Sequence, residues 1–170
     1  MNEHDRDEHG FEADMLIRSL RYSLGTTAFL AGLDKFFNLL TDWEKYLSPA
    51  MTEKIPVSDR TFMKIVGVVE MAAGAGLLAG IDDAKMGYTL AGWLLGITGN
   101  LLTNGYYDVA VRDTNMALEA LVLARLAEMK KKKSESGVRG MRESWPERPG
   151  DAEKLSAREI LASSDITRVA

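Results

Sequence analysis

The chain has 170 residues, enough for one domain, with a formal net charge of −4 and a mean hydropathy of −0.13. It contains no cysteine, which excludes disulfides, thiolate nucleophiles, iron–sulfur clusters and cysteine zinc sites. Its two histidines, His4 and His9, lie in an acidic N-terminal segment, which excludes a haem or a conventional zinc ion held by histidine within an apolar core.

Charge is concentrated at the two ends of the chain. Residues 1–17 are strongly acidic, whereas residues 130–170 begin with the basic run Lys130–Lys133 and continue with mixed charge, serine, proline and glycine. Such segments cannot bury enough apolar surface to offset chain entropy. We therefore expect a disordered acidic tail at 1–17 and a disordered tail at 130–170, around an apolar domain at 18–129.

Four apolar stretches follow one another in that domain, at about 20–40, 61–80, 84–104 and 109–129. Each has roughly the 20 residues that a helix needs to cross the hydrocarbon core of a bilayer. A helix of a soluble bundle would carry a charged outer face at a 3.6-residue period, and the run from Met86 to Tyr107 carries no charge at all. The last stretch contains several charges and would alone be interpreted as amphipathic. Beside the other three, it predicts an all-α polytopic membrane protein, a four-transmembrane-helix bundle with disordered polar tails.

Basic residues predict the orientation of this bundle in the cell membrane. Lys130–Lys133 directly follows the fourth stretch, and Arg18 and Arg21 flank the first. Because positive residues near span ends favour the cytoplasm, both termini are expected to be cytoplasmic. The loop at 41–60 then faces outward. We interpret the lysine run as an orientation anchor and expect the lipid bilayer, not nucleic acid, as a partner.

Polar side chains are predicted to gather in the outer half of the bundle, judged from a rise of about 1.5 Å per residue. The candidate site consists of Asp34, Lys35, Glu70, Asn100, Arg112 and Asp113. Charges at membrane depth are costly and mark sites. They form either a structural ion-pair network that fixes helix register or a ligand pocket open to the outer leaflet, and the two can coexist. Glu70 distinguishes between these two interpretations. Without a cation beside it, its carboxyl group could exchange protons with a carrier such as a quinone, whereas pairing with Arg112 would favour the structural network.

Helical periodicity places further residues on faces that we expect to point inward. On the first helix the polar face is Ser23, Thr27, Asp34 and Asn38, and on the third it is Thr89, Trp93, Gly96, Asn100 and Asn104. The fourth helix offers two faces, one with Arg112, Asn115 and Glu119 and one with Asp113, Ala117, Ala120 and Ala124. Gly67 and Gly74 flank Glu70 and would let helices approach closely. Trp93 and Tyr88 are interpreted as packing residues, and the loop at 41–60 is expected to lie over the pocket.

An ordered set of motifs resembles a known family. The set comprises Arg21-Tyr-Ser-Leu-Gly25 with Ala31-Gly-Leu-Asp-Lys-Phe36, then Val66-Gly-Val-Val-Glu70, then Leu94 to Asn100 with Gly105-Tyr-Tyr-Asp-Val-Ala-Val-Arg-Asp113. Over residues 18–128 it resembles the DoxX and DoxX-like membrane proteins. The resemblance implies a four-helix integral membrane protein associated with membrane redox work, such as a small subunit of thiosulfate:quinone oxidoreductase. It maps the family's motif positions onto the same six candidate site residues.

Three functions follow as hypotheses. The first is a subunit of a membrane redox system that contacts a quinone or similar lipid-soluble carrier and a partner redox subunit, without a covalent or metal-bound cofactor. The second is a non-catalytic membrane anchor or assembly partner for a soluble enzyme. The third is a small proton-coupled carrier, for which a homo-oligomer could supply the pathway. Whether the chain is itself catalytic is left open.

Overall fold

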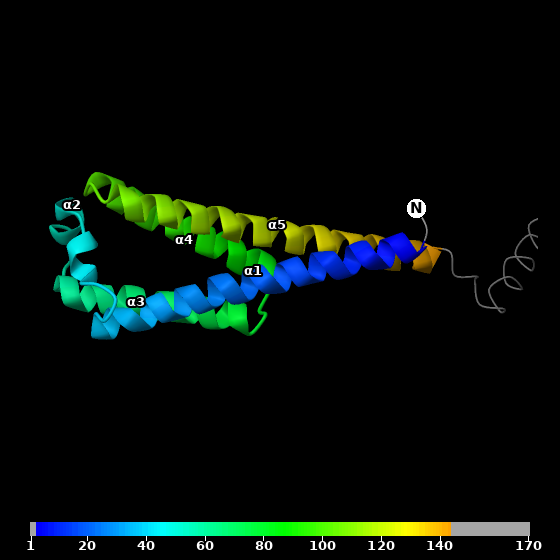
Figure 1. Cartoon of the computed structure of the whole chain (residues 1–170), viewed down its shortest axis with the longest axis horizontal. Helices are drawn as coiled ribbons and strands as arrows, with labels where there is room; N and C mark the ends of the chain where they lie inside the picture. The colour runs from blue at the N-terminus through cyan, green and yellow to red at the C-terminus, as the bar shows by residue number, and fades with distance from the viewer. Residues whose placement is uncertain (1–2, 144–170) are drawn as a thin grey trace, which may run out of the picture. The chain divides into compact units, whose positions relative to one another are not determined.

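The computed structural model of this protein describes residues 3–143. The described chain is helical and contains no strand, which confirms the predicted all-α class for this part. Four long helices, α1 (Glu3–Phe37), α3 (Asp59–Leu78), α4 (Asp83–Thr103) and α5 (Tyr107–Glu143), form the framework (Figure 1). The first two are joined by the short helices η1 (Trp43–Tyr46) and α2 (Pro49–Thr52). We refer to residues 43–52 as the η1–α2 segment.

The helix bounds agree with the predicted stretches in the middle of the chain and differ at its ends. α3 and α4 begin and end close to the predicted limits, but α1 begins at Glu3 and α5 continues to Glu143. Residues 3–17 and 130–143 are therefore helical where the sequence predicted disorder. Helix propagation from an existing helix costs little, and Lys130 Nζ lies 2.6 Å from Asp14 Oδ1, which ties the two extensions together. Residues 1–2 and 144–170 of the predicted tails lie outside the described residues.

The chain divides into two compact units, Met1–Lys131 and Lys132–Ala170. The first contains all the helices apart from the C-terminal part of α5. In the second, the described residues 132–143 continue that helix, and their described side chains are exposed. All six site residues predicted from the sequence belong to the first unit.

Local signals in the sequence set where α3 and α4 begin. The Ser58 hydroxyl accepts a hydrogen bond from the Thr61 backbone N–H at the start of α3, and the Asp82 carboxylate does the same for Lys85 at the start of α4. Hydrogen bonds from the Lys85 backbone and side chain lower the pKa of Asp82, which keeps this cap charged. The tight turn between the helices requires Gly80 at a φ of +70°.

Glycines let α1 and α3 pack at close range. A Cβ atom added to Gly67 would lie 2.5 Å from the Gly32 carbonyl oxygen, and one added to Gly74 would lie 2.6 Å from that of Gly25. A similar contact joins the other pair of helices, because a Cβ on Gly87 of α4 would lie 2.7 Å from the Ala120 carbonyl oxygen of α5. The bundle is thus built from two tight helix pairs, as small residues permit.

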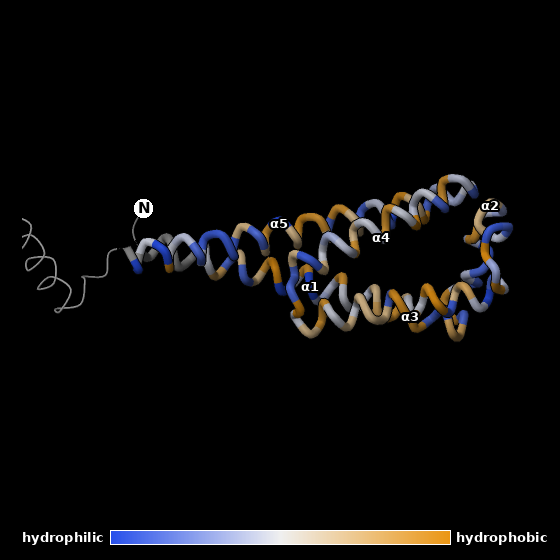
Figure 2. The backbone as a smooth tube through the Cα atoms, turned by 180° about the vertical axis from the view of Figure 1, so that it is seen from behind, coloured by the Kyte–Doolittle hydropathy of each residue, from blue (hydrophilic) through white to orange (hydrophobic). Residues whose placement is uncertain are grey.

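The two pairs meet around a shared apolar core and then diverge. The core takes side chains from all four long helices: Ile17, Leu24, Ala28, Leu77, Leu90, Ala91, Leu94, Ala117, Ala120 and Leu123. From this core the α1–α3 pair and the α4–α5 pair separate toward the end that carries the η1–α2 segment, as both backbone views show (Figures 1 and 2). That segment bridges the diverging ends.

Large apolar side chains face outward on each long helix. Examples are Leu30 on α1, Ile65 on α3, Leu95 on α4 and Leu118 on α5, all about half exposed. By length and composition, α3 alone among the described helices could cross a membrane. Charged residues in α1 and α5, and glycine, threonine and asparagine in α4, lower the hydropathy of the others. The predicted four-span arrangement is therefore not confirmed by hydropathy.

Candidate functional site

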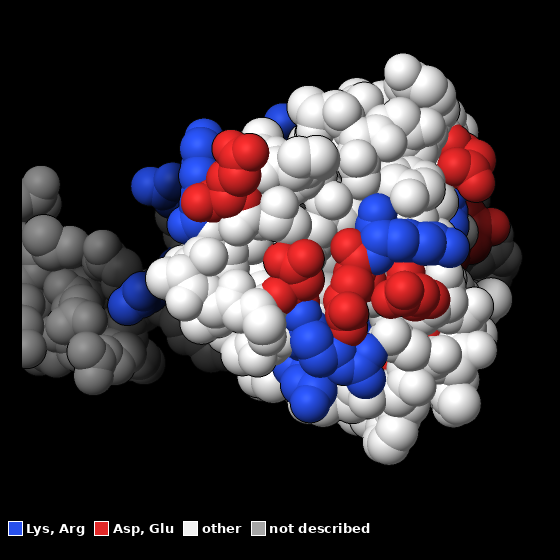
Figure 3. All heavy atoms as spheres, turned by 90° about the vertical axis from the view of Figure 1, so that its left-hand side faces the viewer, with Lys and Arg blue, Asp and Glu red and all other residues white. Residues whose placement is uncertain are grey.

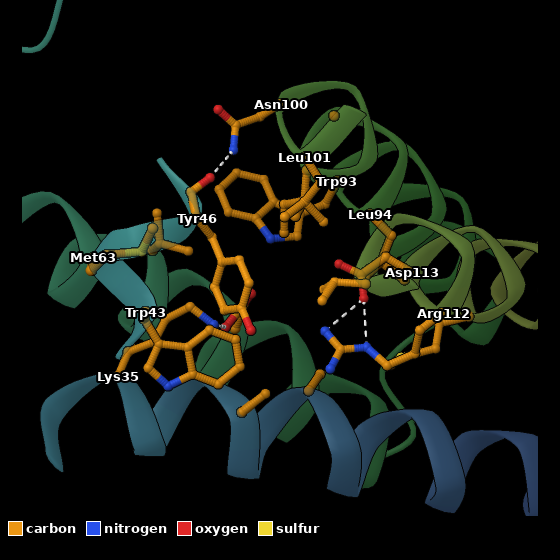
Figure 4. A pocket seen from close by; sticks show the side chains of 18 of the residues that line it. Lys35, Trp43, Tyr46, Met63, Trp93, Leu94, Asn100, Leu101, Arg112 and Asp113 are labelled. Carbon is orange, nitrogen blue, oxygen red and sulfur yellow. Dashed lines mark hydrogen bonds and ion pairs between the residues drawn. The ribbon is translucent and has the colours of Figure 1, made fainter. Parts of the chain in front are cut away.

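A cavity of about 640 Å³ lies between the diverging helix pairs. Its walls are mostly apolar and come from α1, α3, α4, α5 and the η1–α2 segment (Figure 4). Five of the six predicted site residues line it: Lys35, Glu70, Asn100, Arg112 and Asp113. The volume falls in the range of small-molecule sites, which are typically apolar with a few convergent polar groups.

A buried ion pair joins α1 and α3 at the cavity wall. Lys35 Nζ lies 2.5 Å from Glu70 Oε2, and the two side chains are only 5% and 9% exposed. The same ammonium group lies 3.8 Å from the centre of the Trp43 ring, a cation–π contact. The cation that reaches Glu70 is thus Lys35 and not Arg112, which was the pairing considered from sequence. Because each charge has a partner, this pair supports a role in fixing helix register.

Asp34 is buried but does not line the cavity. Its carboxylate accepts hydrogen bonds from the backbone N–H groups of Leu39 and Leu40, at 2.9 and 3.1 Å, and from Trp43 Nε1 at 2.7 Å. The chain leaves α1 here through Asn38, whose φ of 53° is left-handed. Asp34 therefore holds the end of α1 against the η1–α2 segment, a structural task.

Asn100 fastens the η1–α2 segment to α4. Its side-chain amide donates to the Tyr46 carbonyl oxygen at 2.7 Å and accepts from the Ser48 backbone N–H at 3.1 Å. One turn further on, Asn104 donates to the carbonyl oxygens of Lys45 and Leu47. The expected position of this loop beside the pocket is confirmed, because Trp43, Tyr46, Leu47 and Met51 line the cavity.

Arg112 and Asp113 form a second ion pair on the opposite wall. Arg112 Nε and Nη2 each lie 2.9 Å from Asp113 Oδ1, with the arginine side chain 55% exposed and the aspartate 6% (Figure 4). Of the two α5 faces predicted to point inward, only one is buried, although Arg112 on the other face lines the cavity. Asp113, Ala117, Ala120 and Ala124 are buried, whereas Arg112, Asn115 and Glu119 are exposed. Successive residues of a helix point about 100° apart, so the face of Asp113 and the face of Glu119 cannot both pack against the core.

Trp93, which the sequence analysis interpreted as a packing residue, also lines the cavity. Its indole projects from α4 into the cavity, on the same side as Tyr46 (Figure 4). The indole N–H is buried and has no hydrogen-bond partner among the described residues. The indole also acts electrostatically on the Glu70 carboxylate. The sequence did contain one signal for this position, because Trp93 lies on the same inward-pointing helical face as Gly96 and Asn100.

Other charged side chains gather at the end of the bundle. Figure 3 shows Lys, Arg, Asp and Glu side chains clustered on the face that the η1–α2 segment and the adjoining helix ends form. One pair there is Arg60 and Glu44, 3.1 Å apart. Within residues 3–143 no group of three or more His, Cys, Asp or Glu side chains could hold a metal ion.

Comparisons with known proteins add no assignment. No protein-family model, no curated protein and no solved structure matches this chain. The resemblance to the DoxX family therefore stays a prediction, and the case for function depends on the geometry of the cavity.

Proposed function

We propose that this chain is a four-helix protein of the cell membrane, with both termini cytoplasmic, that holds a quinone or similar lipid-soluble carrier as a subunit of a redox system. The observation that carries the proposal is the cavity: about 640 Å³, mostly apolar, with the Lys35–Glu70 and Arg112–Asp113 pairs in its walls. An apolar tail fits such walls, and the ion pairs supply polar contacts for a head group.

The outer surface supports a membrane environment. Apolar side chains face outward on α1, α3, α4 and α5. Charged side chains gather at the end of the bundle (Figure 3). The charged groups of Asp34, Lys35, Glu70 and Asp113 are buried and hydrogen-bonded within the protein, as ionisable groups in membranes are. A water-soluble protein rarely exposes so wide an apolar surface.

The site favours sideways entry of the ligand. Hydrogen bonds from Asn100 and Asn104 close the end of the cavity beneath the η1–α2 segment. Leu30 of α1 and Arg112 of α5 line the cavity and are both more than half exposed, so the opening lies along the side of the bundle. A carrier dissolved in the bilayer would reach the cavity there without crossing water.

The chemistry needs a partner. Reduction of a quinone to its quinol takes up two electrons and two protons, and a partner redox subunit would supply the electrons. Glu70 and Lys35 are the ionisable groups placed to hold protons beside the head group, and Arg112 is placed to polarise a carbonyl oxygen. Asn115 and Glu119 face outward on α5, where a partner protein would cover them more favourably than lipid.

A membrane anchor for a soluble enzyme is the second candidate. The observation that favours it is the continuation of α5 to Glu143 through charged, exposed residues. If the anchor function is right, deletion of residues 132–170 should release a soluble enzyme that co-purifies with the full chain. Retention of every partner by the truncated chain would contradict it.

The test of the principal proposal is mass spectrometry of small molecules extracted from protein purified in native lipid discs. Wild type should carry a quinone in stoichiometric amount, and Glu70→Gln should lose most of it. Glu119→Gln is the matched control, because Glu119 is exposed and does not line the cavity. A folded wild type that carries only bulk lipid, from a host that makes quinone, would contradict the proposal.

A further inference from the structure

Two tryptophans line the cavity, and their indole N–H groups differ in one respect. Trp43 Nε1 donates to Asp34 Oδ2 at 2.7 Å. Trp93 Nε1 is equally shielded from solvent but has no partner within the described part of the chain. Buried indole N–H groups usually find an acceptor, because leaving one unsatisfied is costly. The Trp93 N–H is therefore a group in this cavity that could donate to an acceptor on a ligand.

Space for that acceptor lies beside Trp93. Gly92, one residue before Trp93, and Gly96, three residues after it, both line the cavity. A Cβ atom added to either would meet no atom of the described chain within 4 Å. These glycines do not serve close helix packing, in contrast to Gly32 and Gly67. They leave this part of the cavity wall without side chains.

The charges around the cavity favour a neutral ligand. Lys35 is paired with Glu70, and Arg112 with Asp113, so the lining charges balance. An anionic or cationic head group would break this balance in a poorly solvated place. A carbonyl oxygen accepts a hydrogen bond without adding charge. The balanced charges, and an N–H without a hydrogen-bond partner in the described chain, therefore both favour a carbonyl group.

We propose that the Trp93 N–H donates a hydrogen bond to a ring carbonyl oxygen of the carrier, and so orients a neutral quinone-type head group beside the Lys35–Glu70 pair. This inference rests on the proposed function, since it specifies how the carrier is recognised. It makes Trp93 a ligand-binding residue, and it places the bound carbonyl oxygen in the cavity that Glu70 also lines.

The experiment titrates the full chain, reconstituted in quinone-free lipid discs, with a short-tailed ubiquinone analogue. Trp93→Phe keeps an aromatic ring and removes the N–H, and it should weaken binding by about tenfold, the effect of one buried hydrogen bond. Binding of a ring analogue without carbonyl groups should be the same in both proteins. Trp93→His, which restores an N–H, should recover part of the affinity for the quinone.

A second readout needs no variant. In protein labelled with ¹⁵N at its indole nitrogens, the Trp93 N–H resonance should move downfield on addition of the quinone, while that of Trp43 should stay in place. Equal quinone affinity of wild type and Trp93→Phe, or an unmoved Trp93 resonance at saturating quinone, would overturn the inference and leave the proposed function standing. Wild type that binds no quinone would instead overturn the proposed function.

Discussion

Gly67→Ala tests whether close glycine contact between α1 and α3 holds the site together. The added Cβ would lie 2.5 Å from the Gly32 carbonyl oxygen and 3.1 Å from Lys35 Cβ, whereas ordinary contacts begin near 3.4 Å. The helices must therefore separate by about 1 Å, because a backbone oxygen cannot rotate away. Overpacking of this kind costs about 1–3 kcal/mol, and the backbone clash favours the upper end. Alanine regains about 1 kcal/mol of helix propensity. The expected net loss is about 2 kcal/mol.

The assay is reversible unfolding in mixed micelles by added sodium dodecyl sulfate, followed by circular dichroism, which gives the free energy of unfolding. Gly99→Ala is the matched control, because it lies within α4 and an added Cβ there would meet no described atom within 4 Å. This control should match wild type or gain up to about 1 kcal/mol. If Gly67→Ala proves as stable as Gly99→Ala, the close-contact explanation of the α1–α3 pair is refuted.

Three other outcomes are expected from the structure. Lys35→Met should cost about 3–5 kcal/mol by leaving Glu70 buried without a cation, and adding Glu70→Leu should recover much of it; additive losses in the double-mutant cycle would contradict a direct pair. Asn100→Ala removes two hydrogen bonds and should lower amide hydrogen-exchange protection in the η1–α2 segment; unchanged protection would show that other contacts hold it. In this cysteine-free chain, a membrane-impermeant maleimide should label Lys54→Cys on intact cells and Ser136→Cys only after permeabilisation; labelling of both from outside would refute the proposed topology.

The sequence was informative where signals are local. Ser58 and Asp82 mark the starts of α3 and α4, and both helices lie close to the predicted limits. The burial of Glu70 could also be expected, because it stands alone in an apolar run between small residues. These features depend on a few neighbouring residues, so the sequence contains enough information to predict them.

Sequence reasoning failed for features that depend on contacts between distant parts of the chain. Periodicity shows which α5 residues share a face, but it does not show that the face of Asp113 meets the cavity while that of Glu119 is exposed. It showed neither the helical extension of α1 back to Glu3 nor the orphan N–H of Trp93. Each depends on neighbours brought together from distant parts of the chain.

The all-α class, helices α3 and α4, and the set of polar residues from which the candidate site is drawn could all be predicted from the sequence alone. The tertiary structure alone decided that Lys35 pairs with Glu70, that Asp34 and Asn100 fasten the η1–α2 segment, and that a cavity opens between two helix pairs. The physical reason is that glycines set how closely α1 approaches α3. That distance determines which side chains can touch, and no single helix encodes it.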